Sequence, residues 1–282
     1  MKKYSFLLEA LSPISHGDTQ TSINNNTNVR LFMRQNVIVN GIPSRIPTLS
    51  ENSIRSVIFR KTLAEHLVSV LNIVSLPKTV VNLLFSGGNL MSGAKSPAGE
   101  FALGKALMSY YPSLELLSGS VDSFILPEGK LRPCLWPVTS EYARFLERVA
   151  PSEVIEESKN ISIFDLTQEE TRTRGTGGES EGNQMLFTYE TLSAGAKFFV
   201  LAHLNYGVSE LCESAFCYAV KNWSGYFGGQ GRQGRGLMSV SELDFSGDGL
   251  AYSDYIEENK EKLKIGLEDG TFCTGTVLCG GK

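Results

Sequence analysis

The 282-residue sequence lacks the features that define several common protein classes. Cysteine is sparse, odd in number and never spaced as C-x-x-C, which argues against a disulfide framework or a zinc knuckle. No apolar run approaches the length of a membrane span. Glu9 interrupts the first apolar run and Pro13 follows it without a small-residue cleavage site, so we expect no signal peptide. These absences predict a reduced, cytoplasmic protein without a membrane partner.

Histidine is scarce as well, which limits acid-base and metal chemistry. His66 lies beside the apolar stripe of a predicted helix and His203 lies within an apolar strand, so both are expected to be packed or surface residues rather than ligands. The G-x-S-x-G, H-E-x-x-H and P-loop motifs are all missing. We therefore predict no catalytic residue, no metal and no cofactor, and only His16 occupies a plausible site for an enzyme.

The chain also lacks the overall basic charge that nucleic-acid binding usually shows, since its net charge is -4. The charge is unevenly distributed, however. From Arg30 to Lys61 there are six basic residues and one acidic residue, a net charge of +5, whereas residues 242–282 carry nine acids and four lysines, a net charge of -5. Two solvated faces would explain this asymmetry, and so would head-to-tail self-association.

The basic segment carries the clearest structural signal. Val37–Val39 is predicted as a strand, Gly41–Pro47 as a turn stiffened by two prolines, and residues 48–71 as a helix. Thr48 with Glu51 three residues later matches a capping box and predicts where the helix begins. Apolar residues at helical spacing predict its buried stripe, namely Ile54, Val57, Ile58, Ala64, Val68 and Leu71.

The start of this helix is predicted to bind an anion. Asn52 and Arg55 fall on the side opposite the stripe, close to the positive end of the helix dipole. Free backbone amides at such an end donate hydrogen bonds to phosphate. An ordinary capped surface helix is the alternative interpretation of the same residues.

Outside this segment, strand and helix signals are mixed. Strands are predicted over residues 4–11, 29–40 and 237–245, and helices up to Tyr110 and from Ser209 to about Tyr226. Residues 185–192 and 196–205 are predicted to pair as a hairpin. Residues 167–184 have almost no apolar side chain and are predicted as an exposed hairpin tip or a disordered loop. The mixture predicts an α+β fold.

A glycine-rich loop follows the last of these helices. Residues 229–234 match the G-x-G-x-x-G spacing, but a helix precedes the loop and a strand follows it, which is the reverse of the dinucleotide-binding order. The loop carries Gln230, Arg232 and Arg235. Its backbone would either approach phosphates or simply turn the chain tightly.

Five segments, taken in order, carry a resemblance to a known family. They are residues 11–17, 41–61, 111–132, 172–185 and 227–236, and the most specific is Pro-x-Leu-Ser-x-Asn-Ser-Ile-Arg at residues 47–55. The resemblance that they carry extends over roughly two-thirds of the chain. These segments resemble the RAMP superfamily, in particular the Cas-seven-like backbone subunit that coats the guide RNA in CRISPR effector complexes.

The resemblance implies a fold and a set of RNA contacts. The fold would be one elaborated domain, residues 1–282, with an RRM-like (ferredoxin-like) antiparallel-sheet core. Large insertions would form a palm, a helical finger region at about 72–160 and a thumb hairpin at about 161–186. By this resemblance the RNA-binding residues are Arg34, Arg45, Ser50, Asn52, Arg55, Arg60, Lys61, Arg172, Arg174, Gln230, Arg232 and Arg235.

The resemblance also bears on catalysis. Target-cleaving type III relatives place an aspartate before the proline turn, whereas this chain has Asn24, Asn25 and Asn26 there. Asparagine cannot supply the anionic oxygen that a hard divalent cation prefers. We therefore predict a subunit without catalysis, from a type I or type IV complex.

The predicted partners follow from the same resemblance. They are CRISPR guide RNA, target nucleic acid paired to that guide, further copies of the chain, and other CRISPR effector subunits. Two alternatives stay open. One is a RAMP-type endoribonuclease that uses His16 or Asp18, and the other is a scaffold protein that assembles without RNA.

Overall fold

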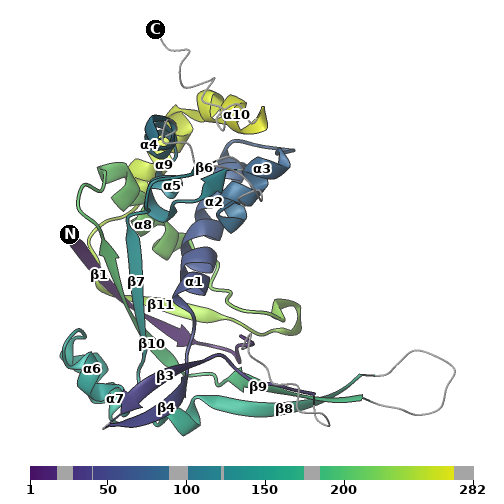
Figure 1. Ribbon diagram of the computed structural model, residues 1–282, viewed down its shortest axis with the longest axis vertical. Coiled ribbons are helices and arrows are strands. Elements are labelled where there is room, and N and C mark those ends of the chain that lie inside the picture. Colours follow the sequence, from purple (N-terminus) through teal and green to yellow (C-terminus); the bar gives the residue numbers. More distant parts are fainter. Residues whose placement is uncertain (18–27, 40, 89–100, 122–123, 175–184, 270–282) are drawn as a thin grey trace, which may run out of the picture.

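A four-stranded antiparallel sheet forms the centre of the computed structural model, which describes residues 1–17, 28–39, 41–88, 101–121, 124–174 and 185–269 (Figure 1). The strand order is β11-β1-β10-β7. The strands are β1 (Lys2–Ala10), β7 (Leu131–Pro137), β10 (Lys197–Leu204) and β11 (Met238–Asp244). A long helical segment lies between β1 and β7 in the chain, and α8 (Glu210–Asn222) lies between β10 and β11. This is the β-α-β-β-α-β order of a ferredoxin-like core, so the predicted α+β, RRM-like fold is confirmed.

Each face of the sheet packs against a hydrophobic cluster around the central strand β10. On β10, Phe198, Val200 and Ala202 join the main core beneath the helices, whereas Phe199 and Leu201 join a second cluster on the opposite face. Because successive side chains of a strand point to opposite faces, a strand covered on both sides reads as an uninterrupted apolar run.

The helix predicted over residues 48–71 is continuous over residues 51–70. It comprises α1 (Glu51–Ile54), the π-helical η1 (Arg55–Lys61) and α2 (Thr62–Val70). The predicted capping box is wrong, because Ser50 is the N-cap and its Oγ accepts from the backbone amide of Ser53 at 3.1 Å. Thr48 is buried and precedes the cap. The helix therefore begins three residues later than predicted.

The proline segment before this helix is a strand rather than the predicted turn. β3 (Arg34–Val39) pairs with β4 (Ile42–Pro47), and Pro43 and Pro47 lie opposite Ile38 and Arg34. A two-stranded hairpin has an open edge on each strand, so prolines that lack an N–H are tolerated there. Gly41, with φ of +82°, lies in the turn.

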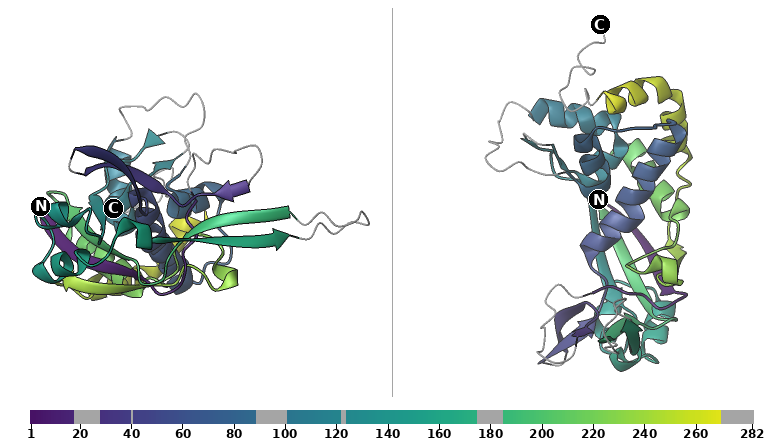
Figure 2. Two further views of the ribbon diagram at one scale, coloured as in Figure 1. Left: turned by 90° about the horizontal axis from the view of Figure 1, so that it is seen from below. Right: turned by 90° about the vertical axis from the view of Figure 1, so that its right-hand side faces the viewer.

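The predicted hairpin between residues 185–192 and 196–205 is also wrong. β9 (Met185–Leu192) pairs with β8 (Thr167–Arg174) and with β2 (Asn28–Arg30), whereas β10 pairs with β1 and β7. Residues 167–184 were predicted as an exposed hairpin tip or a disordered loop. Of these, residues 167–174 form a strand of a hairpin with β9, because backbone pairing needs no apolar side chains. The two long strands project away from the rest of the molecule (Figures 1 and 2).

The remaining elements are short. They are α3 (Lys78–Val81), η2 (Asn82–Ser86), α4 (Phe101–Tyr110), α5 (Pro112–Leu117), β5 (Ser120–Val121), β6 (Phe124–Ile125), α6 (Ala143–Leu146), α7 (Ser152–Ser158), η4 (Ile163–Asp165), η5 (Gly231–Gln233), α9 (Leu250–Glu258) and α10 (Lys260–Glu268). Residues 72–160, expected to be a helical region, are divided by the core strand β7. Among the described residues, no helix combines the length and apolar content needed to cross a bilayer.

Candidate nucleic-acid interface

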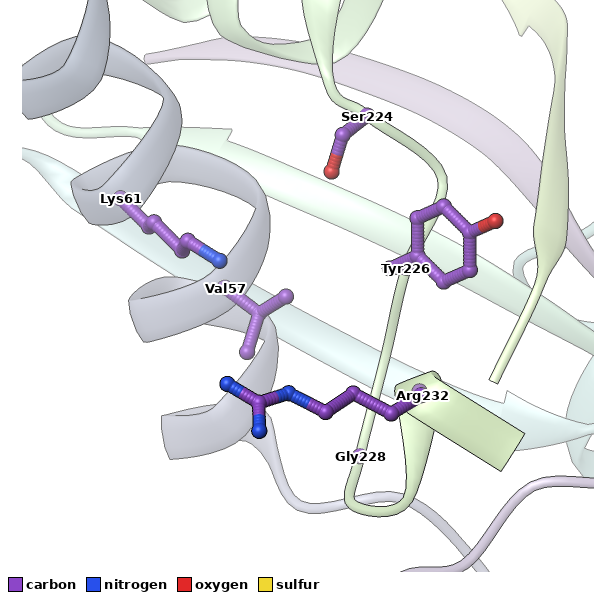
Figure 3. Close-up of a pocket in the computed structure, with 7 residues that line it drawn as sticks. Val57, Lys61, Ser224, Tyr226, Gly228 and Arg232 are labelled. Atoms are coloured by element: carbon purple, nitrogen blue, oxygen red, sulfur yellow. The ribbon is translucent and has the colours of Figure 1, made fainter. Parts of the chain in front are cut away.

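An open groove of about 490 Å³ separates η1 from the glycine-rich loop (Figure 3). Val57 and Lys61 line it from the helix, four residues apart and therefore on one face. The other wall is formed by Ser224, Tyr226, Gly228, Gly231 and Arg232. We call this feature the cationic groove, because Lys61 and Arg232, two of the predicted RNA-binding residues, both line it.

The two cations of the cationic groove are accessible. Lys61 makes a salt bridge to Glu65 with 3.6 Å between Nζ and Oε1, and the two side chains are 55% and 54% exposed. Such a solvated pair contributes little and is easily exchanged. Arg232 is exposed, and within the described parts of the chain it has neither an ion pair nor a side-chain hydrogen bond. Both charges are therefore available to an anionic ligand.

Arg55 and Arg60 are also predicted to bind RNA, but their side chains point toward η2 and α5 rather than into the cationic groove. The Arg55 guanidinium donates to the carbonyl of Leu117 at 2.9 Å, and Arg60 donates to the carbonyls of Leu83 and Ser118 at 3.2 Å each. The π-helical i to i+5 pattern of η1 places these two arginines on one face. Burial, reinforced by neighbouring Arg55, lowers the pKa of Arg60 to about 10. Arg55 therefore binds the C-terminal end of α5, and Arg60 links η2 to the residue that follows α5.

Arg34 and Arg235 are paired with glutamates of the projecting hairpin. Arg34 donates from both terminal nitrogens to Glu190, and Arg235 donates to Glu170. The Arg235 side chain is only 5% exposed, and its Nη1 is buried with no hydrogen-bond partner among the described residues. These arginines therefore join the hairpin to β3 and to the glycine loop.

The other predicted contact residues are dispersed. Ser50 caps the helix, Asn52 is exposed in α1, and Arg45 is exposed on β4 opposite Asn36. Arg172 and Arg174 lie at the far end of β8, in register with β9, and their side chains lie outside the described residues.

The glycine loop has a defined conformation that brings its backbone close to the segment after β1. The amide of Gly229 donates to Ser15 O at 2.8 Å, and a Cβ at Gly228 (φ +80°) would lie 2.4 Å from the same oxygen. Only glycine fits this approach. Gln230 adopts a left-handed conformation with φ of +64°, and its Oε1 is buried with no hydrogen-bond partner among the described residues. Of the loop's polar side chains, Arg232 is the one that lines the groove.

His16, considered for catalysis, lies under this loop. Its ring packs edge-on against Phe227 and Phe32, with centroids 5.4 and 6.0 Å apart, and burial lowers its pKa. Asp18 lies outside the described residues. In the part of the chain that the structure describes, no three His, Cys, Asp or Glu side chains gather as a metal site.

Sequence reasoning missed several residues of the groove wall. Val57 was assigned to the buried stripe, and Ser224 and Tyr226 were placed at the end of a helix that stops at Asn222. The sequence did contain one feature that could have indicated this wall: an aromatic pair, Tyr226 and Phe227, comes directly before the glycines.

No protein-family model matches the chain, and no curated protein matches it. Among solved structures, one similar chain comes from a structure titled "Type IV-B CRISPR Complex", with a TM-score of 0.58 and 18% sequence identity. The similarity covers 86% of this chain and 90% of that chain. The two chains therefore share a fold over most of their lengths.

Proposed function

We propose that this protein is a subunit of a CRISPR effector complex that binds guide RNA through the cationic groove and displays the bases for pairing. The structural similarity to a chain of a type IV-B CRISPR complex supports membership of such a complex. The observation that carries RNA binding is the meeting of Lys61 and Arg232, distant in sequence, at one open groove. In this role the protein reads the sugar-phosphate backbone and leaves sequence recognition to base pairing.

The charge arrangement favours phosphate as the ligand of the groove. Lys61 has only a solvated partner, and Arg232 has no ion pair among the described residues. Such cations replace the counterions condensed on RNA phosphates, and the released counterions give a sequence-independent, salt-dependent affinity. Arg34 and Arg235, by contrast, are already neutralised by glutamates, so the groove is the better first contact.

The projecting hairpin of β8 and β9 supports assembly along RNA. It extends well beyond the sheet and the helices (Figure 2), and the predicted contact residues Arg172 and Arg174 lie near its end. In the proposed complex the hairpin would reach the RNA segment held by the next copy. The subunit would have no catalytic role of its own.

The experiment is purification of the protein with its native nucleic acid, followed by sequencing and mass measurement by light scattering. We expect RNA with CRISPR repeat sequence and particles containing several copies. Lys61→Ala and Arg232→Ala should each lower RNA retention for all sequences alike. The matched control is Lys159→Ala, because Lys159, the residue directly after α7, is also an ion-paired lysine, 50% exposed. Regular assemblies that persist after nuclease treatment, or retention unchanged in both groove variants, would contradict the proposal.

A further inference from the structure

Tyr226 is an exposed aromatic residue in the wall of the cationic groove. The residue is 51% exposed and lines the groove together with Ser224 and Arg232, and its ring points away from η1 in the view of Figure 3. Lys61 projects from the helix on the other side. An aromatic surface therefore shares one groove with two available cations.

Folding does not account for this side chain. Within the described ranges, Tyr226 makes no side-chain hydrogen bond and no ring contact. Its neighbour Phe227, at 2% exposure, fills the core and packs against His16. The chain thus places one aromatic ring inward for packing and the adjacent ring outward.

The backbone that carries Tyr226 is fixed on both sides. The Phe227 amide donates to Gly236 O at 2.8 Å, and the Met238 amide donates to Gly225 O at 2.7 Å. Tyr226 itself forms a β-bridge with Leu237. A backbone held in this way loses little conformational entropy when a ligand binds beside it.

We infer that Tyr226 stacks against a base of single-stranded RNA whose phosphates lie at Lys61 and Arg232. Each nucleotide presents an anionic phosphate and a flat π face, which matches cations beside an exposed ring. An acidic peptide would use the cations but not the ring. This inference rests on the proposed function and adds a base contact to it.

The test is fluorescence anisotropy with an unstructured RNA oligonucleotide and with the same oligonucleotide carrying abasic sites. We expect Tyr226→Ala to weaken binding of the intact RNA by roughly 5- to 100-fold. Tyr226→Phe should bind within about twofold of wild type, because stacking needs the ring and not the hydroxyl. The salt dependence should stay unchanged, since no charge is removed. Tyr206→Ala, at another exposed tyrosine (81%) outside the groove, is the matched control.

A second measurement does not depend on a variant. Photo-crosslinking of wild-type protein to 5-iodouridine RNA, followed by peptide mass spectrometry, should identify Tyr226. The inference is overturned if Tyr226→Ala binds like wild type, if it weakens abasic RNA by the same factor, or if polyglutamate competes as well as RNA.

The two proposals fail in distinguishable ways. If Lys61→Ala and Arg232→Ala weaken RNA binding but Tyr226→Ala does not, the groove binds RNA and only the stacking contact is wrong. If wild-type protein does not bind RNA, the proposed function fails and the stacking inference fails with it.

Discussion

Replacement of Glu190 by glutamine tests how the projecting hairpin is attached to the body. The Glu190 side chain is 8% exposed and accepts from Arg34 Nη1 at 2.6 Å, from the Phe32 amide at 2.8 Å and from Thr167 Oγ1 at 2.8 Å. Glu190→Gln would leave the Arg34 guanidinium, 21% exposed, without a charged partner. Breaking a buried pair from one side costs about 3–5 kcal/mol. Because Arg34 keeps some access to water, we expect a loss of about 3 kcal/mol at pH 7.

The direction of the pKa shift of Glu190 determines how the stability loss should change with pH. Burial raises the pKa of Glu190, but the hydrogen bonds from Arg34, the Phe32 amide and Thr167 outweigh it and hold that pKa below its usual value. The folded-state pKa is therefore below the unfolded value of about 4.3. A depressed carboxyl pKa contributes stability above the unfolded value, and this contribution is lost as pH falls through the folded value.

Urea unfolding of wild type and Glu190→Gln at pH 7 and in a series below pH 4.5 measures both effects. The stability difference should be largest at pH 7 and should shrink on acidification. The control is Glu128→Gln, because Glu128 pairs with Arg132 on the surface, with the side chains 75% and 58% exposed, and such pairs contribute below about 1 kcal/mol. An equal loss in both variants, or a Glu190→Gln deficit that does not change with pH, would refute the reasoning.

Three further predictions concern the elements around the groove. Ser50→Ala should lower the free energy of unfolding by about 1 kcal/mol in urea titrations, since it removes the side-chain cap of the helix. Gly228→Ala should destabilise more than Gly234→Ala by the same assay. Both glycines have positive φ, but only Gly228 would place a Cβ against Ser15 O, while nothing lies within 4 Å at Gly234. RNA incubated with the protein and Mg²⁺ should remain intact on denaturing gels, whereas cleavage abolished by Asp18→Ala would establish the endoribonuclease alternative.

Local patterns were sufficient to predict much of the fold. The first strand, the helix capped by Ser209 and the final strand follow apolar periodicity. Both strands form within two residues of the predicted bounds, and the helix begins as predicted but ends at Asn222, four residues before the predicted end. The α+β class follows from their mixture. Strand partners were harder to predict, because β9 joins β8 and β2 through backbone pairing that leaves no sequence signature. Two prolines in β4 likewise resembled a turn, since their tolerance depends on the open edges of the hairpin.

The candidate site was only partly predictable, because the ion-pair partners of its arginines, like the strand partners, are distant in sequence. Sequence could assign Lys61 to a basic segment, and the family resemblance added Arg232, but neither could show which arginines have internal partners. Arg34 pairs with a glutamate 156 positions away. Arg55 and Arg60 turn inward because η1 is π-helical, a phase that α-helical spacing does not predict. Charge counted along the chain therefore overestimated the charge that a ligand would meet.

The most direct test of the central claim is the salt dependence of RNA affinity for wild type and the Lys61→Ala/Arg232→Ala double variant. Each phosphate contact to a single strand contributes about 0.7 to the slope of log affinity against log salt concentration. If both groove cations bind phosphate, the slope should fall in magnitude by about 1.4, equally for RNAs of unrelated sequence. A double variant with the wild-type slope, or with a loss confined to particular sequences, would contradict the account.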